Sequence, residues 1–103
     1  MKNTDEMKIL DELYKIIKKR IKEIPANSSV ATLVKKGEDR VIQKVGEEAV
    51  EVLIAAKGTS KKRIIEEMTD LYFMTLVLLA VKNITLDEVF AELTKRRKKR
   101  IKN

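Results

Sequence analysis

Residues 71–81 form the longest apolar run of the chain, interrupted only by Thr75. A run of this length is too short to cross a bilayer, which takes about 18–20 apolar residues. In a helix, however, it is apolar on almost every side and needs cover on every side. It therefore predicts a buried core helix. Three other helices in a chain of 103 residues can cover two or three of its faces. We expect the rest to pack against a second copy, in a homodimer or a higher homo-oligomer.

Hydrophobic residues elsewhere recur at spacings of three and four, which is the period of an amphipathic helix. One proline and three glycines are too few for a many-turned all-β fold. We therefore expect an all-α fold, an antiparallel helical bundle whose neighbours are joined by short connections. Four main helices are expected over about 5–24, 38–57, 60–82 and from 85 onward, with a short helical turn over 30–34.

Several of these helices carry boundary signals. Thr4 is the expected N-cap of the first helix and Pro25 its stop. Gly58 follows the second helix, where glycine commonly ends a helix. Thr85 and Glu88 have the spacing of a capping box, in which each side chain accepts a hydrogen bond from the other residue's backbone N–H. This pair predicts the start of the last helix.

The net charge of +7 comes from one end of the chain. Seven basic residues and no acid lie between positions 95 and 102: Lys95, Arg96, Arg97, Lys98, Lys99, Arg100 and Lys102. The rest of the chain has 23 − 7 = 16 basic residues against 16 acidic ones, so it is neutral. We expect one all-α domain over residues 1–94 and a basic helix end or tail over 95–103. Such a block is typical of a solvated helix end, and a weak contact with a polyanion is the alternative.

The chain has no cysteine and no histidine. This excludes disulfides, thiolate or histidine metal sites and Ser-His-Asp triads. Catalysis would have to use carboxylates, lysines, hydroxyls or a hard metal ion. A cysteine-free chain suits a reducing compartment, and no apolar stretch of signal-peptide length follows Met1. We therefore expect a cytoplasmic protein without a membrane segment.

Two pairs of acidic residues are spaced to share a helix face. Glu48 and Glu51 are three residues apart on one predicted helix, and Glu67 and Asp70 are three apart on the next. Side chains at this spacing are neighbours, and like charges there repel. A divalent cation would remove the conflict, and an all-oxygen ligand set favours Mg²⁺, with Mn²⁺ as the alternative. A solvated acidic face accounts for these residues about as well, so both interpretations stay open here.

Basic residues lead up to the first acidic pair. Lys36, Arg40, Lys44 and Glu48 follow one another at steps of four. On a helix, this spacing places them along one face. A face that is basic and then acidic suits a polyphosphate whose charge is shared between cations and a metal. Salt bridges that stabilise the helix without any function are the alternative. We take Lys36, Arg40 and Lys44 as candidate phosphate contacts.

Several short motifs follow one another over residues 10–97. They are Lys36-Gly37, Lys44-x-Gly46-Glu47-Glu48-Ala49-x-Glu51, Ala55-Ala56-Lys57, Glu67-x-x-Asp70-Leu71, Leu76-Val77-Leu78-Leu79-Ala80, Leu86-Asp87-Glu88-Val89 and Ala91-Glu92-Leu93. Taken in this order, they resemble the motifs of the phosphoribosyl-ATP pyrophosphohydrolase family. That family is part of a superfamily of all-α, MazG-like nucleotide pyrophosphohydrolases, whose signature is Glu-Glu-x-x-Glu followed by Glu-x-x-Asp.

The resemblance implies an enzyme that hydrolyses phosphoribosyl-ATP to phosphoribosyl-AMP and pyrophosphate, the second step of histidine biosynthesis. It implies that Mg²⁺ is bound by Glu48, Glu51, Glu67 and Asp70. Glu47 would be a second acid that orients or deprotonates the attacking water. Glu47 and Glu48 are thus the implied catalytic carboxylates.

The chain departs from the family pattern at two places. Phe73-Met74 stands where relatives usually have Tyr-His, and Ser28-Ser29-Val30 stands where they usually have Ser-Tyr-Thr. These changes bear on the substrate more than on the metal site. One alternative is therefore a related pyrophosphohydrolase of other nucleoside triphosphates. The other is a non-catalytic helical oligomer whose basic tail contacts nucleic acid, which we do not favour.

Overall fold

The computed structural model describes residues 8–24 and 27–101, the last four of them by their backbone only. It contains five helices: α2 (Ile9–Glu23), α3 (Ser29–Lys35), α4 (Glu38–Lys57), α5 (Lys61–Val81) and α6 (Leu86–Ile101). The described residues contain no strand. The prediction of an all-α fold is confirmed, and the short turn expected over 30–34 is a helix of its own.

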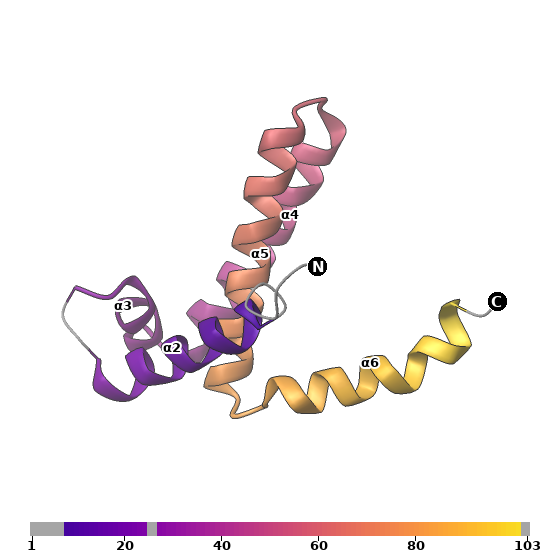
Figure 1. Cartoon of the computed structure of the whole chain (residues 1–103). Helices are drawn as coiled ribbons and strands as arrows, with labels where there is room; N and C mark the ends of the chain where they lie inside the picture. The colour runs from indigo at the N-terminus through magenta and orange to yellow at the C-terminus, as the bar shows by residue number, and fades with distance from the viewer. Residues whose placement is uncertain (1–7, 25–26, 102–103) are drawn as a thin grey trace.

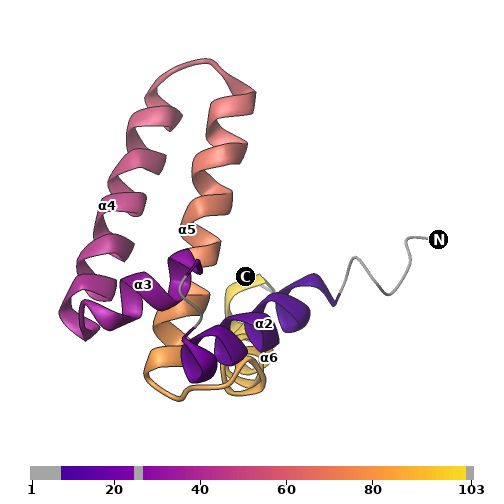
Figure 2. The ribbon, with the colours of Figure 1, turned by 90° about the vertical axis from the view of Figure 1, so that its left-hand side faces the viewer.

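The long helices α4 and α5 lie antiparallel and side by side as a hairpin (Figures 1 and 2). Gly58 ends α4, as predicted, and the hydroxyl of Ser60 caps α5 by accepting a hydrogen bond from the backbone N–H of Arg63 at 3.1 Å. This tight connection keeps the two helices in contact along most of their length. The two predicted acidic pairs lie on these two helices.

Helices α2 and α3 pack at the base of the hairpin (Figure 2). Ile17 of α2, Val41 of α4 and Val77 of α5 are the largest fully buried side chains and form the centre of the core. The hydroxyl of Tyr14 donates a hydrogen bond to the carbonyl of Ile84 at 2.6 Å. This bond ties α2 to the turn that follows α5.

The apolar run of α5 is covered on most sides. Met74, Leu76, Val77 and Ala80 are buried, Tyr72 is 58% exposed, and the other apolar residues of the run are partly buried. Together with α2, α3 and α4, the run therefore forms a core from which only Tyr72 is exposed to solvent. Among the described residues, none of the helices is both long and apolar enough for a membrane crossing.

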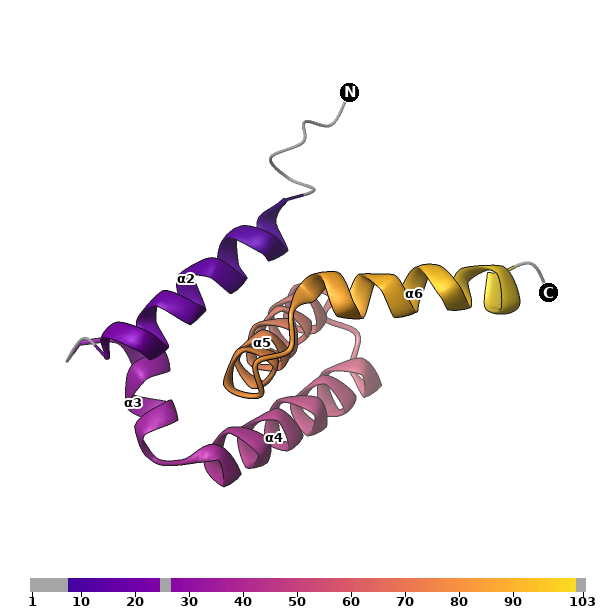
Figure 3. The ribbon, with the colours of Figure 1, turned by 90° about the horizontal axis from the view of Figure 1, so that it is seen from below.

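Helix α6 does not pack beside the other helices in the way a four-helix bundle requires. Leu86 anchors its first turn in the core, and the helix then extends away from the hairpin (Figures 1 and 3). Of its apolar residues, Leu93 remains 60% exposed. The expected antiparallel bundle of four main helices is thus realised only in part. Residues 95–101 continue α6 rather than forming a separate tail.

The predicted boundaries agree with the structure where they can be compared. The capping box is present: the Thr85 backbone N–H donates to Glu88 Oε1 at 2.8 Å, and the Glu88 N–H donates to Thr85 Oγ1 at 3.2 Å. Helix α2 ends at Glu23, one residue before its expected end. The expected cap at Thr4, the start of the helix at residue 5 and the stop at Pro25 lie outside the described residues.

Candidate active site

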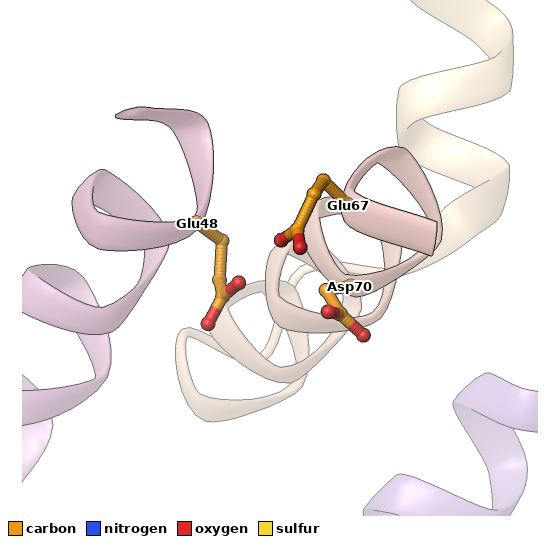
Figure 4. Close-up of side chains that lie close together, drawn as sticks. All are labelled: Glu48, Glu67 and Asp70. Carbon is orange, nitrogen blue, oxygen red and sulfur yellow. The ribbon is translucent and has the colours of Figure 1, made fainter. Parts of the chain in front are cut away.

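Three carboxylates from the two long helices come together. Glu48 of α4 and Glu67 and Asp70 of α5 each place one oxygen within 4.8 Å of the others. Figure 4 shows Glu48 and Glu67 reaching toward one another from opposite helices, with Asp70 one turn further along α5. The antiparallel packing of α4 and α5 produces this meeting, because it brings the middle of α4 to the level of these two α5 residues.

Two neighbouring cations partly offset the negative charge of the cluster. Lys44 Nζ lies 3.1 Å from Glu48 Oε2, and Arg63 lies 3.6 Å from Glu67 Oε2. The side chains of Glu48 and Glu67 are only 13% and 20% exposed, so solvent screens their repulsion less than at an open surface. Lys44 and Arg63 each precede their glutamate by about one helical turn. They therefore relieve part of the repulsion between the carboxylates, which the sequence analysis assigned to a metal ion alone.

The two other predicted acids lie beside this cluster. Glu51 is half-buried on α4, one turn after Glu48, and is not one of the described carboxylates that meet within that distance. Glu47 lies instead beside the basic stripe, which consists of Lys36, Arg40 and Lys44. Its carboxylate lies 3.5 Å from Arg40 Nη1 and 3.8 Å from Lys44 Nζ. The structure therefore brings together three of the four predicted metal ligands and places the predicted base next to the predicted phosphate contacts.

A cavity of about 480 Å³ adjoins the cluster. It lies between the α3 segment and α5, and Lys44 also lines it, so this one side chain touches both the cavity and the acidic cluster. Lys36 lines it as well. The hydroxyl of Ser28, which accepts a hydrogen bond from the Ala31 N–H at 3.2 Å, fixes the start of α3 and with it one wall of the cavity. The full lining is Asn27, Ser28, Ser29, Val30, Thr32, Leu33, Lys36, Lys44, Phe73, Met74 and Val77.

The path of the chain places Lys36 at this cavity. Gly37, between α3 and α4, has a φ of 109°, a conformation that residues with a side chain rarely adopt. It allows α4 to begin directly after Lys36, so the basic stripe runs from the end of α3 into α4. Lys36, Arg40 and Lys44 do lie on this route, but only Lys36 and Lys44 line the cavity.

The donor set of the cluster fits a hard divalent cation. All three side chains offer carboxylate oxygens, and the sequence has no histidine or cysteine that could add an imidazole or thiolate ligand. Oxygen-only sites suit Mg²⁺, Ca²⁺ or Mn²⁺ rather than zinc or copper. Glu48, Glu67 and Asp70 are therefore the residues of this structure that could hold such an ion.

Arg63 and most of the residues that line the cavity were not predicted from the sequence as parts of the site. The spacing of four between Arg63 and Glu67 was the available signal for the first. Leu33 and Val77 could not be recognised in the sequence as cavity residues, because they follow the same pattern as other core residues of an amphipathic helix. The two departures from the family pattern, Ser29-Val30 and Phe73-Met74, turn out to line the same cavity.

Comparisons with known proteins agree on one family. The profile described as Phosphoribosyl-ATP pyrophosphohydrolase matches residues 10–97. A protein named Phosphoribosyl-ATP pyrophosphatase from Saccharolobus solfataricus is 46% identical over 90 residues, which cover 87% of this chain and 96% of that protein. A protein of the same name from Metallosphaera sedula is 48% identical over 90 residues, covering 87% of this chain and 97% of its own length.

Proposed function

The chain belongs to the phosphoribosyl-ATP pyrophosphohydrolase family, and we propose on this premise that it hydrolyses phosphoribosyl-ATP to phosphoribosyl-AMP and pyrophosphate, the second step of histidine biosynthesis. The observation that carries the proposal is the meeting of Glu48, Glu67 and Asp70 beside a cavity that Lys44 shares with them. Phosphoanhydride hydrolysis needs this combination, because the anionic substrate has to be held next to a centre that can bind a cation.

The metal-binding residues of the proposal are Glu48, Glu67 and Asp70, with Glu51 as the fourth ligand. Glu51 is three residues from Glu48, so the Cβ atoms of the two are about 5–6 Å apart, and a rotation of its side chain would join it to the group. When bound, Mg²⁺ would polarise the phosphoanhydride and favour ionisation of the attacking water. Mn²⁺ suits the same ligands.

Glu47 is the proposed proton acceptor. In the reaction, the oxygen of a water bonds to phosphorus, the bond between the α- and β-phosphoryl groups breaks, and one proton of the water goes to a base. In a chain without histidine, a carboxylate is the suitable base near neutral pH. Glu47 is a half-exposed carboxylate beside Arg40 and Lys44, where it can orient the water. Glu48, the other catalytic carboxylate of the proposal, acts as a metal ligand.

Lys36, Arg40 and Lys44 are the proposed phosphate contacts. Arg40 and Lys44 already hold carboxylates at 3.1–3.8 Å, so they sit where anionic oxygens are bound. A phosphate oxygen would take the place of one of these carboxylate oxygens, which is a charge-assisted exchange. Lys36 lines the same cavity as Lys44.

We also propose a homo-oligomer, a dimer in its simplest form. The hairpin exposes a group of large apolar side chains, and burying them offers the driving force. They are Ile42, Val50, Leu53 and Ile54 on α4 with Ile65 and Tyr72 on α5. Patches of this kind mark association surfaces in proteins. The cytoplasmic location and the division at residue 94 stay predictions from the sequence.

The experiment that tests the function is pyrophosphate release from phosphoribosyl-ATP, with ATP and dUTP in parallel, with and without Mg²⁺. We expect metal-dependent cleavage of phosphoribosyl-ATP and its loss in Glu51→Gln. Cleavage of ATP or dUTP instead would keep the site and change the substrate. A folded protein that cleaves none of them with Mg²⁺ present would overturn the enzyme proposal and direct attention to the basic end of α6.

A further inference from the structure

The cavity beside the cluster has a wall that phosphate binding alone does not require. We propose that it receives the adenine base of the substrate, with Phe73 and Met74 as the wall against which the ring lies. This inference rests on the proposed function and deepens it: it assigns the base, rather than the phosphates, to the α3–α5 cavity.

The composition of the cavity suits an anionic ligand with an apolar ring. Its volume of about 480 Å³ falls in the usual range for small-molecule sites, roughly 300–1,000 Å³, which are mostly apolar with a few placed polar groups. Among the described residues that line it are two lysines and no carboxylate. The apolar wall is made by Val30, Leu33, Phe73, Met74 and Val77, and the polar side chains are Asn27, Ser28, Ser29 and Thr32.

The cavity and the cluster share the same helix faces. Asp70 and Met74 are four residues apart on α5, which is about one turn and 6 Å along the helix axis. Lys44 and Glu48 are four apart on α4 and are joined by an ion pair of 3.1 Å. A ligand whose ring lies in the cavity can therefore send its phosphate chain past Lys44 and reach the carboxylates within about one helical turn.

Phe73 and Met74 are suited to a flat aromatic ring. Phe73 is half-buried, so part of its ring is free to meet a ligand, and Met74 is held in place at 6% exposure. Aromatic rings gain from offset stacking or edge contacts, and the methionine sulfur adds a polarisable contact. Neither side chain can bind phosphate, which is why we assign this wall to the base.

The first test is a titration of the whole protein with AMP, in buffer with a chelator and with methyl-labelled methionines. Ring currents of a bound base shift nearby methyl signals. We expect the methyl signal of Met74 to move and that of Met68, on the same helix but outside the cavity lining, to stay. Ribose 5-phosphate, which lacks the base, is expected to leave the Met74 signal unchanged.

The second test compares neighbouring aromatic residues. Phe73→Leu keeps an apolar side chain but removes the ring, and it should weaken AMP binding about two- to tenfold, the size of one aromatic contact. Tyr72→Leu is the matched control, because Tyr72 is 58% exposed and does not line the cavity. It should leave the AMP dissociation constant unchanged.

The proposal is overturned by a Met74 signal that AMP does not move, or that ribose 5-phosphate moves equally. It is also overturned when Tyr72→Leu and a folded Phe73→Leu weaken AMP binding equally. Because these measurements use no metal and no hydrolysis, they can fail while wild-type protein still releases pyrophosphate from phosphoribosyl-ATP. AMP can equally bind as proposed in a protein that does not hydrolyse phosphoribosyl-ATP, so the two proposals are tested independently.

Discussion

At the scale of single residues, Lys44 is the point where the cavity and the acidic cluster meet. Its ammonium lies 3.1 Å from Glu48 and also lines the cavity. In the structure it therefore occupies a position from which it competes with a cation for Glu48. A bound metal would free Lys44 to contact phosphate, so the two ligands should favour each other's binding.

Replacing Lys44 should separate these two effects. In Lys44→Gln, Mg²⁺ alone should bind more tightly, by up to about fivefold, since a partly exposed ion pair of roughly 0.2–1 kcal/mol no longer competes. The KM for phosphoribosyl-ATP should rise about tenfold or more, the loss of one hydrogen bond to a charged group. Calorimetric Mg²⁺ titration and steady-state kinetics measure the two. Weaker Mg²⁺ binding in this variant would contradict the assigned role.

Much of the site could be predicted at this scale because charge and spacing are visible in a sequence. The i, i+3 spacing of two acidic pairs and the expected antiparallel packing indicated that carboxylates of the two helices could meet, whereas the choice of Glu48, Glu67 and Asp70 as metal ligands came from the resemblance to the family. The missing part was geometric. Spacing shows that Glu47 and Glu48 point about 100° apart, but it does not show which of them faces the neighbouring helix. In the structure Glu48 turns toward α5 and Glu47 toward Arg40.

At the scale of elements, two glycines of the α3–α4 region have opposite roles. Gly37 adopts a φ of 109°, whereas Gly46 lies within α4 with no atom near the place of an added Cβ. Gly37→Ala should lower the free energy of unfolding by roughly 1–2 kcal/mol, because a side chain is strained in that conformation. Gly46→Ala should raise it by about 0.5–1 kcal/mol through better helix propensity. Urea unfolding checks both, and equal effects of the two substitutions would contradict this assignment.

The capping box makes the start of α6 sensitive to acid. Hydrogen bonds from the Thr85 backbone N–H and hydroxyl lower the pKa of Glu88. A lowered pKa in the folded state means that the ionised carboxylate stabilises the helix start above its unfolded pKa. This contribution is lost as the pH falls through the folded pKa.

We therefore expect amide protons in the first turns of α6 to exchange faster as the pH is lowered below the ordinary pKa range of a glutamate, after correction for intrinsic exchange rates. Glu88→Gln has no carboxylate to protonate, so its corrected exchange should be fast both above and below that range. Hydrogen exchange followed by NMR measures this, with α5 amides as the internal reference. Equal pH dependence of wild type and variant would show that the carboxylate does not hold the helix start.

The helix boundaries could be predicted closely for a related reason. The capping box at Thr85 and the stop at Gly58 act within a few residues of the chain, so they are visible without knowledge of the fold. The direction of α6 was not visible in the same way. It depends on what Leu86 and its neighbours meet in space, and the expected bundle therefore differed from the structure at this helix.

At the scale of the whole molecule, the exposed apolar side chains of α4 are the dominant feature of the surface. Leu53 is 65% exposed and Val50 52%, on a helix whose opposite side carries the acidic cluster. If two copies pair through this face, the stability of the protein depends on its concentration. The sequence pointed to the 71–81 run as the surface for a second copy, but Tyr72 is the only exposed residue of that run, so the surface on α4 was not predicted.

Leu53→Glu should break the pairing, because it places a charge in the middle of the proposed interface. Light scattering coupled to gel filtration should give a dimer or larger assembly for the wild type and a smaller species for the variant. Lys15→Glu, a charge change on the exposed surface of α2, is the control and should leave the mass unchanged. A wild type that is monomeric at high micromolar concentration would contradict the oligomer.

The central claim is that the carboxylates meeting between α4 and α5 hold the metal that hydrolysis needs. The most direct test compares two adjacent glutamates of α5, Glu66→Gln and Glu67→Gln, in pyrophosphate release from phosphoribosyl-ATP at saturating Mg²⁺. Glu67 belongs to the cluster, whereas Glu66 is exposed and outside it. We predict a loss of roughly 10²–10³-fold in kcat/KM for Glu67→Gln, several kcal/mol of transition-state stabilisation, and less than twofold for Glu66→Gln. Equal activity of the two folded variants would contradict the claim.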